Sequence, residues 1–374
     1  MVIGFDISAL SLPRSGVGNY QFQLLRHMIP LAPQHFFNLY AFNFRNRHRF
    51  DEIRFDSPNY AKHIIPIPQK AITAWWLMFG LPKLEAFVPP CDVYQVSEIC
   101  LQPSKKAKTV AFVHDLTTIL FPQFHTWGNR FLHRERFKRL DRADAILTNS
   151  EYTKKDIAER LGIKPEKIFV THLGADESFR PLSSQAIGPI LAQYQLSKPY
   201  ILFVGTLEPR KNLETLIVAF NGLKAKRGIP HTLVLAGQKG WRYRPLLEAI
   251  ERSPYHSQIK LLDYLPDQEL PALMNGADIF VYPSFYEGFG LPVLEAMQCG
   301  TPVVTSNVSS LSEVGGDACL YVDPHSVNDL TERIFQVIHD AEFRKTLSRK
   351  GIERAKLFSW DKCARETIEV YESL

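Results

Sequence analysis

The stretch DIFVYPSFYEGFGLPVLEA, residues 278–296, joins one apolar run to another through a turn with two glycines. Its first part, residues 278–284, is rich in β-branched and aromatic residues, as short buried strands are. Pro292 follows the glycines, and proline suits the first turn of a helix because its missing N–H group needs no acceptor there. The stretch predicts a buried strand, a glycine turn and a helix.

The same rhythm recurs along the chain and predicts an α/β fold with parallel sheets. A chain of 374 residues exceeds the size of a single hydrophobic core, so two domains are expected. We place a Rossmann-like domain at residues 1–185 and a second at 190–357, divided within the Pro- and Ser-containing segment 180–199. The expected strands are residues 2–7, 37–42, 109–115, 145–150, 167–174, 200–206, 231–237, 259–265, 278–284, 302–307 and 318–323.

Charge is distributed unevenly between the two halves. Residues 1–180 hold 24 Lys and Arg against 17 Asp and Glu, whereas residues 181–374 hold 20 against 22. A basic first half suits phosphates, an anionic membrane or nucleic acid, and equally a solvated surface. The cysteines are odd in number, widely spaced and without a CxxC motif, which indicates neither a disulfide framework nor a zinc site and favours the cytoplasm. They are Cys91, Cys100, Cys299, Cys319 and Cys363.

No uninterrupted apolar run is long enough to cross a bilayer, and the first residues lack the pattern of a signal peptide. Residues 71–88, AITAWWLMFGLPKLEAFV, come closest to membrane behaviour. Consecutive tryptophans at 75 and 76 beside lysines suit a headgroup boundary and hence a peripheral contact through the first domain. A helix packed in that domain explains the same residues and is the favoured interpretation.

Three further segments carry polar or glycine residues where an expected strand ends. Gly16 and Gly18 precede an expected helix and would let backbone amides approach an anion, although a simple turn has the same pattern. Arg210 and Lys211 stand at a strand-to-helix turn, where they would either clamp a diphosphate or form a solvated basic pair. His114 ends the strand expected at 109–115, and a lone histidine there is more often structural.

The two glutamates of the opening stretch, Glu287 and Glu295, lie on either side of its glycine turn. The amides of Phe289, Gly290 and Leu291 would face an anion at the start of the helix. Glu287 would precede the turn, and Glu295 would lie in the first helical turn. The carboxylates would then flank one bound group, with hydroxyls on either side of a phosphate, instead of forming an acid/base pair.

The segment YEGFGLPVLEAMQCGTPVV closely resembles the E-x7-E segment of the retaining GT-B glycosyltransferases of the large family four, or group 1. The resemblance extends to VGTLEPRKNLETLIVAF, ADAILTNSEYTKKDIAERLGI and FVHDLTTILFP, and so covers nearly the whole chain. It implies a GT-B fold, with two Rossmann-like domains that face a central cleft. The first domain would take the acceptor and be completed by a C-terminal helix at about 358–374, and the second would take a nucleotide-sugar donor.

The resemblance also implies roles for single residues. Arg210 and Lys211 match the clamp on the donor diphosphate, and Glu295 matches the acid that binds the ribose hydroxyls. Glu287 and His114 match groups that hold the donor sugar. The backbone groups would come from Gly16, Gly18, Gly288, Phe289, Gly290 and Leu291, and Gly237, Tyr264 and Leu265 would contact the base. Thr206 is a departure, because many relatives have arginine at that donor-binding position.

The reaction implied is the transfer of a hexosyl group from a nucleotide diphosphate sugar to an acceptor hydroxyl, with retention at the anomeric carbon. The chain has no DxD motif, and two side-chain cations with a helix dipole would neutralise the diphosphate, so no metal or cofactor is expected. UDP-hexose is slightly favoured over GDP-mannose as donor. The expected acceptor is a growing glycan, free or lipid-linked, in polysaccharide or glycolipid assembly; nucleic acid is not an expected partner.

Other functions remain open at this point. GT-B architecture also serves sugar-nucleotide epimerases and phosphorylases, which share a diphosphate site. A non-catalytic nucleotide-binding protein is a third reading, against which the retained Glu287, Glu295, Arg210, Lys211 and His114 argue.

Overall fold

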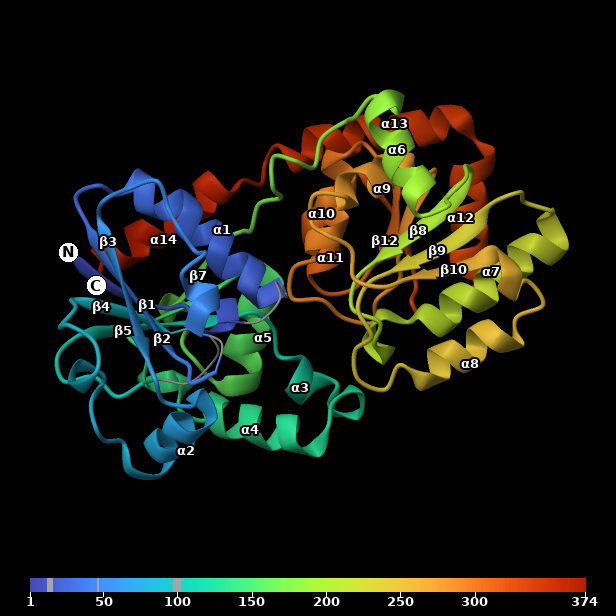
Figure 1. Ribbon diagram of the computed structural model, residues 1–374. Coiled ribbons are helices and arrows are strands. Elements are labelled where there is room, and N and C mark those ends of the chain that lie inside the picture. Colours follow the sequence, from blue (N-terminus) through green and yellow to red (C-terminus); the bar gives the residue numbers. More distant parts are fainter. Residues whose placement is uncertain (12–15, 46, 97–101) are drawn as a thin grey trace. The chain divides into compact units, whose positions relative to one another are not determined.

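The computed structural model describes residues 1–11, 16–45, 47–96 and 102–374. These residues form two compact units. Unit 1 comprises Met1–Gly174 and Ser359–Leu374, and unit 2 comprises Ala175–Phe358 (Figure 1). The prediction of two doubly wound parallel-sheet α/β domains is confirmed, because each unit has its own parallel sheet flanked by helices.

In unit 1 the described residues form a seven-stranded sheet of order β3-β2-β1-β4-β5-β6-β7, and every strand pairing is parallel. The strands are β1 (Val2–Asp6), β2 (Phe36–Phe42), β3 (Tyr60–Ile65), β4 (Val93–Val96), β5 (Lys108–Val113), β6 (Ala145–Thr148) and β7 (Ile168–Val170). The helices are α1 (Gly16–Leu31), α2 (Gln69–Phe79), α3 (Thr117–Leu120), α4 (Trp127–Phe137), α5 (Glu151–Leu161) and α14 (Trp360–Glu372).

In unit 2 the sheet has six strands in the order β10-β9-β8-β11-β12-β13, again paired in parallel. They are β8 (Tyr200–Val204), β9 (Thr232–Ala236), β10 (Ile259–Leu262), β11 (Ile279–Tyr282), β12 (Val303–Ser306) and β13 (Cys319–Val322). The helices are α6 (Ser184–Gln193), α7 (Leu213–Arg227), α8 (Arg244–Arg252), α9 (Leu270–Gly276), α10 (Leu291–Gln298), α11 (Ser310–Gly315), α12 (Val327–His339) and α13 (Ala341–Ala355).

The first boundary between the units lies at Gly174. From the sequence, the first domain was expected to end at residue 185. The intervening segment is bound to unit 2, because Asn275 donates to the carbonyl of Arg180 at 2.9 Å and accepts from the N–H of Leu182 at 2.9 Å. Helix α6 then follows and packs against α9. The side-chain amide of Asn275 thus ties the segment to unit 2.

Helix α14 lies in unit 1, although it follows unit 2 in the chain. It packs against α1, and Tyr371 on it is buried and hydrogen-bonded to Gln95 of β4. Asp361 also contacts His27 of α1, with 2.7 Å between carboxylate and ring nitrogen. The last helix is therefore part of the core of the first sheet.

The turn after β9 is built on a close backbone approach at Gly237. This glycine has a φ of +147°, and a Cβ there would collide with the carbonyl oxygen of Gly205 at the end of β8. The Gly237 N–H donates to the Leu262 carbonyl at 3.0 Å, at the end of β10. A side chain at residue 237 would push apart the carboxyl ends of three neighbouring strands.

We expect Gly237→Ala to lower the free energy of unfolding by about 1–3 kcal/mol or more, because it adds a clash to an unfavourable backbone angle. The shift is measured as a lower urea midpoint. Gly222→Ala is the control, since a Cβ on this residue of α7 would meet Thr331 Cγ2 of α12 only at 3.9 Å, an ordinary contact. Equal midpoints for both variants would contradict the role of the close approach.

Among the described residues, no helix is long and apolar enough to span a membrane. Helix α2 explains the sequence pattern at 71–88, because one of its faces is core and the other is not. Ile72 and Trp76 are buried, whereas Trp75, Met78 and Phe79 are exposed. The four described cysteines, Cys91, Cys299, Cys319 and Cys363, are free, and Cys100 lies outside the described residues.

Candidate active site

The structure gathers Arg210, Lys211 and Glu287 into a buried ionic cluster at the carboxyl ends of β8 and β11. Lys211 Nζ lies 2.7 Å from Glu287 Oε1, and Arg210 contacts Glu287 Oε2 at 2.7 Å. Lys211 also donates to the hydroxyl of Tyr282 at 2.6 Å. The basic pair is therefore not a solvated surface pair, since Lys211 is only 6% exposed.

Electrostatics holds Glu287 in its ionised form. Burial alone would raise the pKa of Glu287, but Arg210, Lys211 and their hydrogen bonds outweigh burial and lower it to about 2. Burial, followed by the neighbouring Arg210 charge, lowers the pKa of Lys211 below its usual range, against the opposing pull of Glu287. In this state Glu287 forms an ion pair with each of the two cations that the sequence assigns to a diphosphate.

Glu208 belongs to the same cluster and escaped the sequence analysis. Its Oε1 accepts hydrogen bonds from Arg210 Nε at 3.0 Å and from a terminal guanidinium nitrogen at 2.6 Å. A further guanidinium nitrogen donates to the carbonyl of Tyr286 at 2.7 Å. Glu208 therefore fixes the plane of the guanidinium, while its buried Oε2 has no hydrogen-bond partner. The sequence signal that could have identified Glu208 is its position two residues before Arg210.

Backbone contacts hold Glu287 in place. Its N–H donates to Ser309 Oγ at 2.9 Å, and its carbonyl accepts from Ser310 Oγ at 2.9 Å. Ser309 has a φ of +52°, a conformation that non-glycine residues rarely adopt. Strained residues of this kind occur at functional sites. Neither serine was singled out from the sequence, because both lie some twenty residues farther along the chain.

The glycine turn leads into α10 as predicted, with Gly290 as the residue before the helix. Gly290 has a φ of +99°, and a Cβ there would lie 2.7 Å from Leu311 Cδ2. Gly288 and Phe289 are buried in the turn, Leu291 opens the helix and Pro292 follows. The turn therefore requires glycine at residue 290 for both conformation and space.

The expected place of Glu295 in the first helical turn is wrong. Helix α10 begins at Leu291 and has no acidic residue in its first turn, so Glu295 lies in the second turn. Its side chain is only 8% exposed. Burial, with Asp267 and Asp176 nearby, raises the pKa of Glu295 to about 8. A buried carboxyl under these conditions is suited to hydrogen bonding with a neutral hydroxyl and not to stabilising a helix dipole.

The three residues expected to contact a base lie where β9 and β10 end. Gly237 forms the close approach described above, and Tyr264 and Leu265 follow β10 by two and three residues. Tyr264 is 48% exposed, and its hydroxyl donates to Asp267 at 3.3 Å, whereas Leu265 is buried. Thr206 follows Gly205 after β8, and its Cγ2 leaves no room for a Cβ at residue 240, which would lie 2.7 Å from it. The exposed Tyr264 ring thus lies beside an acid that also acts on Glu295.

The remaining predicted residues belong to unit 1. His114 follows β5, with its ring 4.6 Å from Phe112 and 5.1 Å from Tyr20, measured between centroids. Burial lowers its pKa to about 4, so His114 is neutral near pH 7. Gly16 and Gly18 were expected to precede a helix. In the structure they lie in the first turn of α1 instead. The first N–H groups of a helix have no carbonyl acceptor within the helix and bond to other groups.

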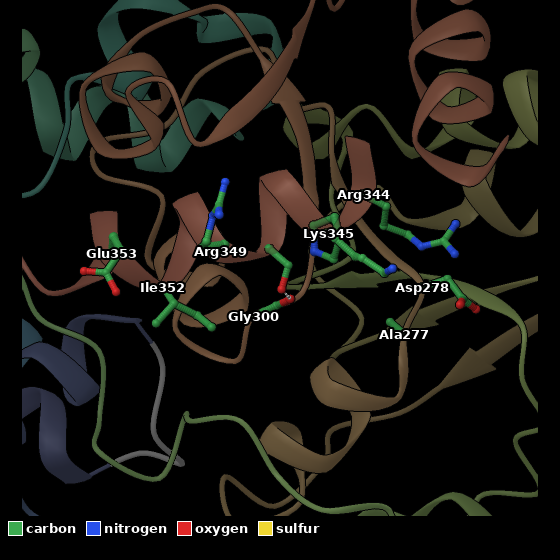
Figure 2. A pocket seen from close by; sticks show the side chains of 10 residues that line it. Ala277, Asp278, Gly300, Arg344, Lys345, Arg349, Ile352 and Glu353 are labelled. Carbon is green, nitrogen blue, oxygen red and sulfur yellow. Dashed lines mark hydrogen bonds between the residues drawn. The ribbon is translucent and has the colours of Figure 1, made fainter. Parts of the chain in front are cut away.

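A hollow of about 440 Å³ lies elsewhere in unit 2 (Figure 2). It is lined by Asp278 and Pro302, which precede β11 and β12, and by basic residues of α13 such as Arg344 and Arg349. It therefore lies at the amino ends of the strands, whereas Glu287 follows the carboxyl end of β11. The residues that line it include no member of the predicted site.

Comparison with known proteins places this geometry in a family. Residues 192–354 match the family described as "Glycosyl transferases group 1", and residues 14–179 match "Glycosyltransferase Family 4". The O-antigen chain mannosyltransferase B of Escherichia coli is 38% identical over 274 residues, which cover 73% of this chain and 72% of that protein. The chain belongs to this glycosyltransferase family.

Other relatives of this glycosyltransferase are longer or more distant. The serotype-specific mannosyltransferase WbdA of Escherichia coli is 32% identical over 279 residues, which cover 71% of this chain but 34% of that protein. Sucrose-phosphate synthase from Thermosynechococcus elongatus has a TM-score of 0.77 at 20% identity, over 100% of this chain and 98% of that one. Anabaena Alr3699/HepE in complex with UDP-glucose has a TM-score of 0.75 at 18% identity, over 100% of both chains. These structures show that the glycosyltransferase has the GT-B fold.

The raised pKa of Glu295 makes the stability of the glycosyltransferase pH-dependent. Between pH 5 and 7 the unfolded carboxyl is ionised while the folded one, with a pKa of about 8, keeps its proton. This group therefore removes roughly 1.4 kcal/mol of stability for each pH unit gained in that window. Glu295→Gln resembles the protonated carboxyl and does not titrate.

We expect the stability of Glu295→Gln relative to the unchanged protein to rise from pH 5 to pH 7. The comparison of urea midpoints for the two proteins at each pH removes the contribution of all other titrating groups. A relative stability that stays constant across this range would show that Glu295 is ionised in the folded protein.

Proposed function

We propose that this glycosyltransferase moves a hexosyl group, with retention at the anomeric carbon, from a nucleotide diphosphate sugar to a hydroxyl of a growing glycan. The observation that carries the proposal is the buried cluster of Arg210, Lys211 and Glu287 beside the glycine turn that opens α10. Two cations next to a helix N-terminus suit a diphosphate. Glu208, which orients Arg210, is added to the predicted group.

In this proposal each predicted residue has a separate task. Arg210 and Lys211 stabilise the charge that develops on the leaving diphosphate, together with the amides of residues 289–291. Glu287 and His114 hold hydroxyls of the transferred sugar, and Glu295 holds the ribose. The neutral state of His114 supports this role, since a neutral imidazole can donate and accept a hydrogen bond.

No metal ion is required in this scheme, because side-chain cations neutralise the diphosphate. Among the described residues, no group of three or more His, Cys, Asp or Glu side chains is placed to hold a metal ion. The leaving phosphate oxygen would take the proton of the acceptor hydroxyl, so no separate general base is assigned.

The sugar that we propose is mannose. Both Escherichia coli relatives above are named mannosyltransferases, and one is named for the O-antigen chain. Of the two donors weighed from the sequence, GDP-mannose therefore replaces UDP-hexose as the first to test. The name of the first relative also favours an acceptor glycan in polysaccharide assembly. The lipid carrier of that glycan and the cytoplasmic face of a membrane are part of our proposal.

Peripheral contact with that membrane is also part of the proposal. Its support is the outer face of α2, where Trp75 is 50%, Met78 68% and Phe79 58% exposed, with Leu81 just beyond. Interfacial aromatics of this kind favour the headgroup boundary.

The decisive experiment incubates the purified protein with GDP-mannose or UDP-glucose, each with and without a mannobiose acceptor that carries a soluble chromophore. Transfer gives an elongated glycan and free nucleoside diphosphate, and proton NMR of the new linkage reports retention. Conversion of the sugar nucleotide without acceptor would identify an epimerase. Binding of the nucleotide, seen as thermal stabilisation, without conversion of any donor would support the non-catalytic reading.

A further inference from the structure

Helix α4 of unit 1 has two faces, and only one of them is required by the fold. Its inner face carries Phe137, which is buried in a cluster with Leu116 and Leu140. Its outer face carries Trp127, Arg130, Phe131 and Arg134, all exposed and spaced at the interval that places them on one side of a helix. The outer face is therefore aromatic and cationic without any contribution to the core.

The two aromatic rings on this outer face are ordered against each other but not covered. Trp127 and Phe131 stack with 5.6 Å between centroids and 13° between planes. They remain 76% and 55% exposed. A surface helix normally turns its aromatic residues to the core and polar residues to water. An exposed stacked pair indicates a surface that is covered when a partner binds.

The outer face borders a hollow of about 410 Å³, within the range of roughly 300 to 1,000 Å³ that small-ligand sites occupy. Its other wall comes from Thr118 and Ile119 of α3 and from Pro122. Of the described residues that line the hollow, two are cationic and none is acidic. The hollow thus offers apolar surface and positive charge together.

The two arginines have their charge available for a ligand. No ion pair joins Arg130 or Arg134 to an acid among the residues that the structure describes. The acids nearby are engaged elsewhere: Glu135 pairs with Lys138 at 2.6 Å, and Asp115 accepts from the Thr117 N–H at 2.8 Å. Because residues four apart on a helix are neighbours, the two guanidinium groups can bind adjacent phosphates.

The hollow also begins close to a predicted catalytic residue. Thr118 stands four residues after His114, on the short helix that follows the carboxyl end of β5. Ligands of doubly wound sheets bind at this edge. A group bound against α4 would therefore lie at the edge of the sheet where His114 follows β5.

We propose that this hollow binds the lipid diphosphate of the acceptor, with Arg130 and Arg134 on the phosphates and Trp127 and Phe131 on the first part of the apolar chain. The inference rests on the proposed function, in which a growing glycan on a lipid carrier is the acceptor. It adds the recognition of the carrier and assigns it to α4. The hollow should bind a lipid diphosphate more tightly than a diphosphate or an apolar chain alone, because the arginines contact the phosphates and the aromatic rings contact the chain.

The probe is farnesyl diphosphate, a soluble diphosphate of an apolar chain, titrated into the full chain while tryptophan emission and heat are recorded. We expect a Kd for farnesyl diphosphate at least about tenfold lower than for farnesol or for inorganic pyrophosphate. The double variant Arg130→Gln with Arg134→Gln should weaken farnesyl diphosphate binding by about tenfold or more. Trp127→Ala with Phe131→Ala should weaken binding of farnesyl diphosphate and leave that of pyrophosphate unchanged.

The matched control is Lys105→Ala with Lys106→Ala, which removes two exposed charges from the same unit and should leave the Kd unchanged. Arg130→Lys with Arg134→Lys keeps the charge and should retain most of the affinity. Thermal midpoints of all variants check folding, which the exposed positions should not disturb. Equal Kd values for the glutamine and control variants would overturn the proposal.

A membrane surface is the competing occupant of the outer face. If the glutamine variant loses cosedimentation with phosphatidylglycerol vesicles while its Kd for farnesyl diphosphate stays within twofold, α4 is a bilayer contact and the proposal is wrong. The binding measurements need no sugar donor. If farnesyl diphosphate binding depends on the arginines but no donor supports transfer, the proposed function is wrong and the proposed lipid diphosphate site is retained. If sugar is transferred to mannobiose but binding does not depend on the arginines, the proposed function is retained and the site is wrong.

Discussion

Lys211→Ala is expected to reduce kcat for hexosyl transfer by about 100-fold or more, since a donor group aimed at developing charge has effects of that size. Lys211 Nζ is buried between Glu287 and the Tyr282 hydroxyl, so no solvent cation can replace it at low cost. The loss should appear in kcat as well as in KM, because negative charge on the leaving diphosphate is greatest in the transition state.

The control for this variant is Lys350→Ala, which removes a lysine 44% exposed on α13 that pairs with Asp317. Initial rates are measured with saturating donor, and circular dichroism establishes that both variants are folded. A Lys211→Ala enzyme with kcat within threefold of the unchanged protein would remove this residue from the proposed mechanism.

Glu287→Gln is expected to tighten binding of a nucleoside diphosphate while it abolishes sugar transfer. Glu287 forms ion pairs with both Arg210 and Lys211, so a diphosphate has to compete with an internal carboxylate. Glutamine keeps the shape but removes the charge. We expect the Kd for GDP to fall by about tenfold, since competition for a charged partner is lost.

The same substitution should make the free protein less stable, by about 3 kcal/mol, because the buried Lys211 and Arg210 both lose their ion pair with residue 287, although Arg210 keeps the one to Glu208. Addition of GDP should then raise its thermal midpoint more than that of the unchanged protein, as expected for a ligand that binds only the folded state. Glu332→Gln is the control, since Glu332 is an exposed partner of Arg227. A GDP shift no larger than that of the control would show that Glu287 does not compete with the diphosphate.

Strand prediction succeeded where the apolar run was continuous and failed where it was not. All six strands of unit 2 coincide with expected segments, and β11 is the strand with which the opening stretch begins. In unit 1, β3 and β4 lie outside the segments predicted to be strands. Strand β3 is half-buried along its whole length, and β4 has only four residues, with a glutamine among them. Without knowledge of the neighbouring strands, neither sequence pattern can be told from that of a loop.

The candidate site was predictable in its residue types but not in its pairing. Proximity of Arg210 and Lys211 to Glu287 depends on the β8–β11 pairing, which no local pattern encodes. For the same reason the anchoring serines at 309 and 310 were missed. The place of Glu295 differed by one helical turn although the start of α10 was predicted, because Glu295 is the fifth residue of a helix that begins at Leu291 and has 3.6 residues per turn.

The position of α14 has a consequence for co-translational folding of the protein. Domains are usually completed in the order in which they are synthesised. Here the first unit needs residues 359–374, which are made after the whole of residues 175–358. Until then the α1 surface that α14 covers is exposed. The first unit therefore lacks this helix while the second unit is synthesised. The nascent chain thus exposes apolar surface for longest in the part made first, where a chaperone has most to protect.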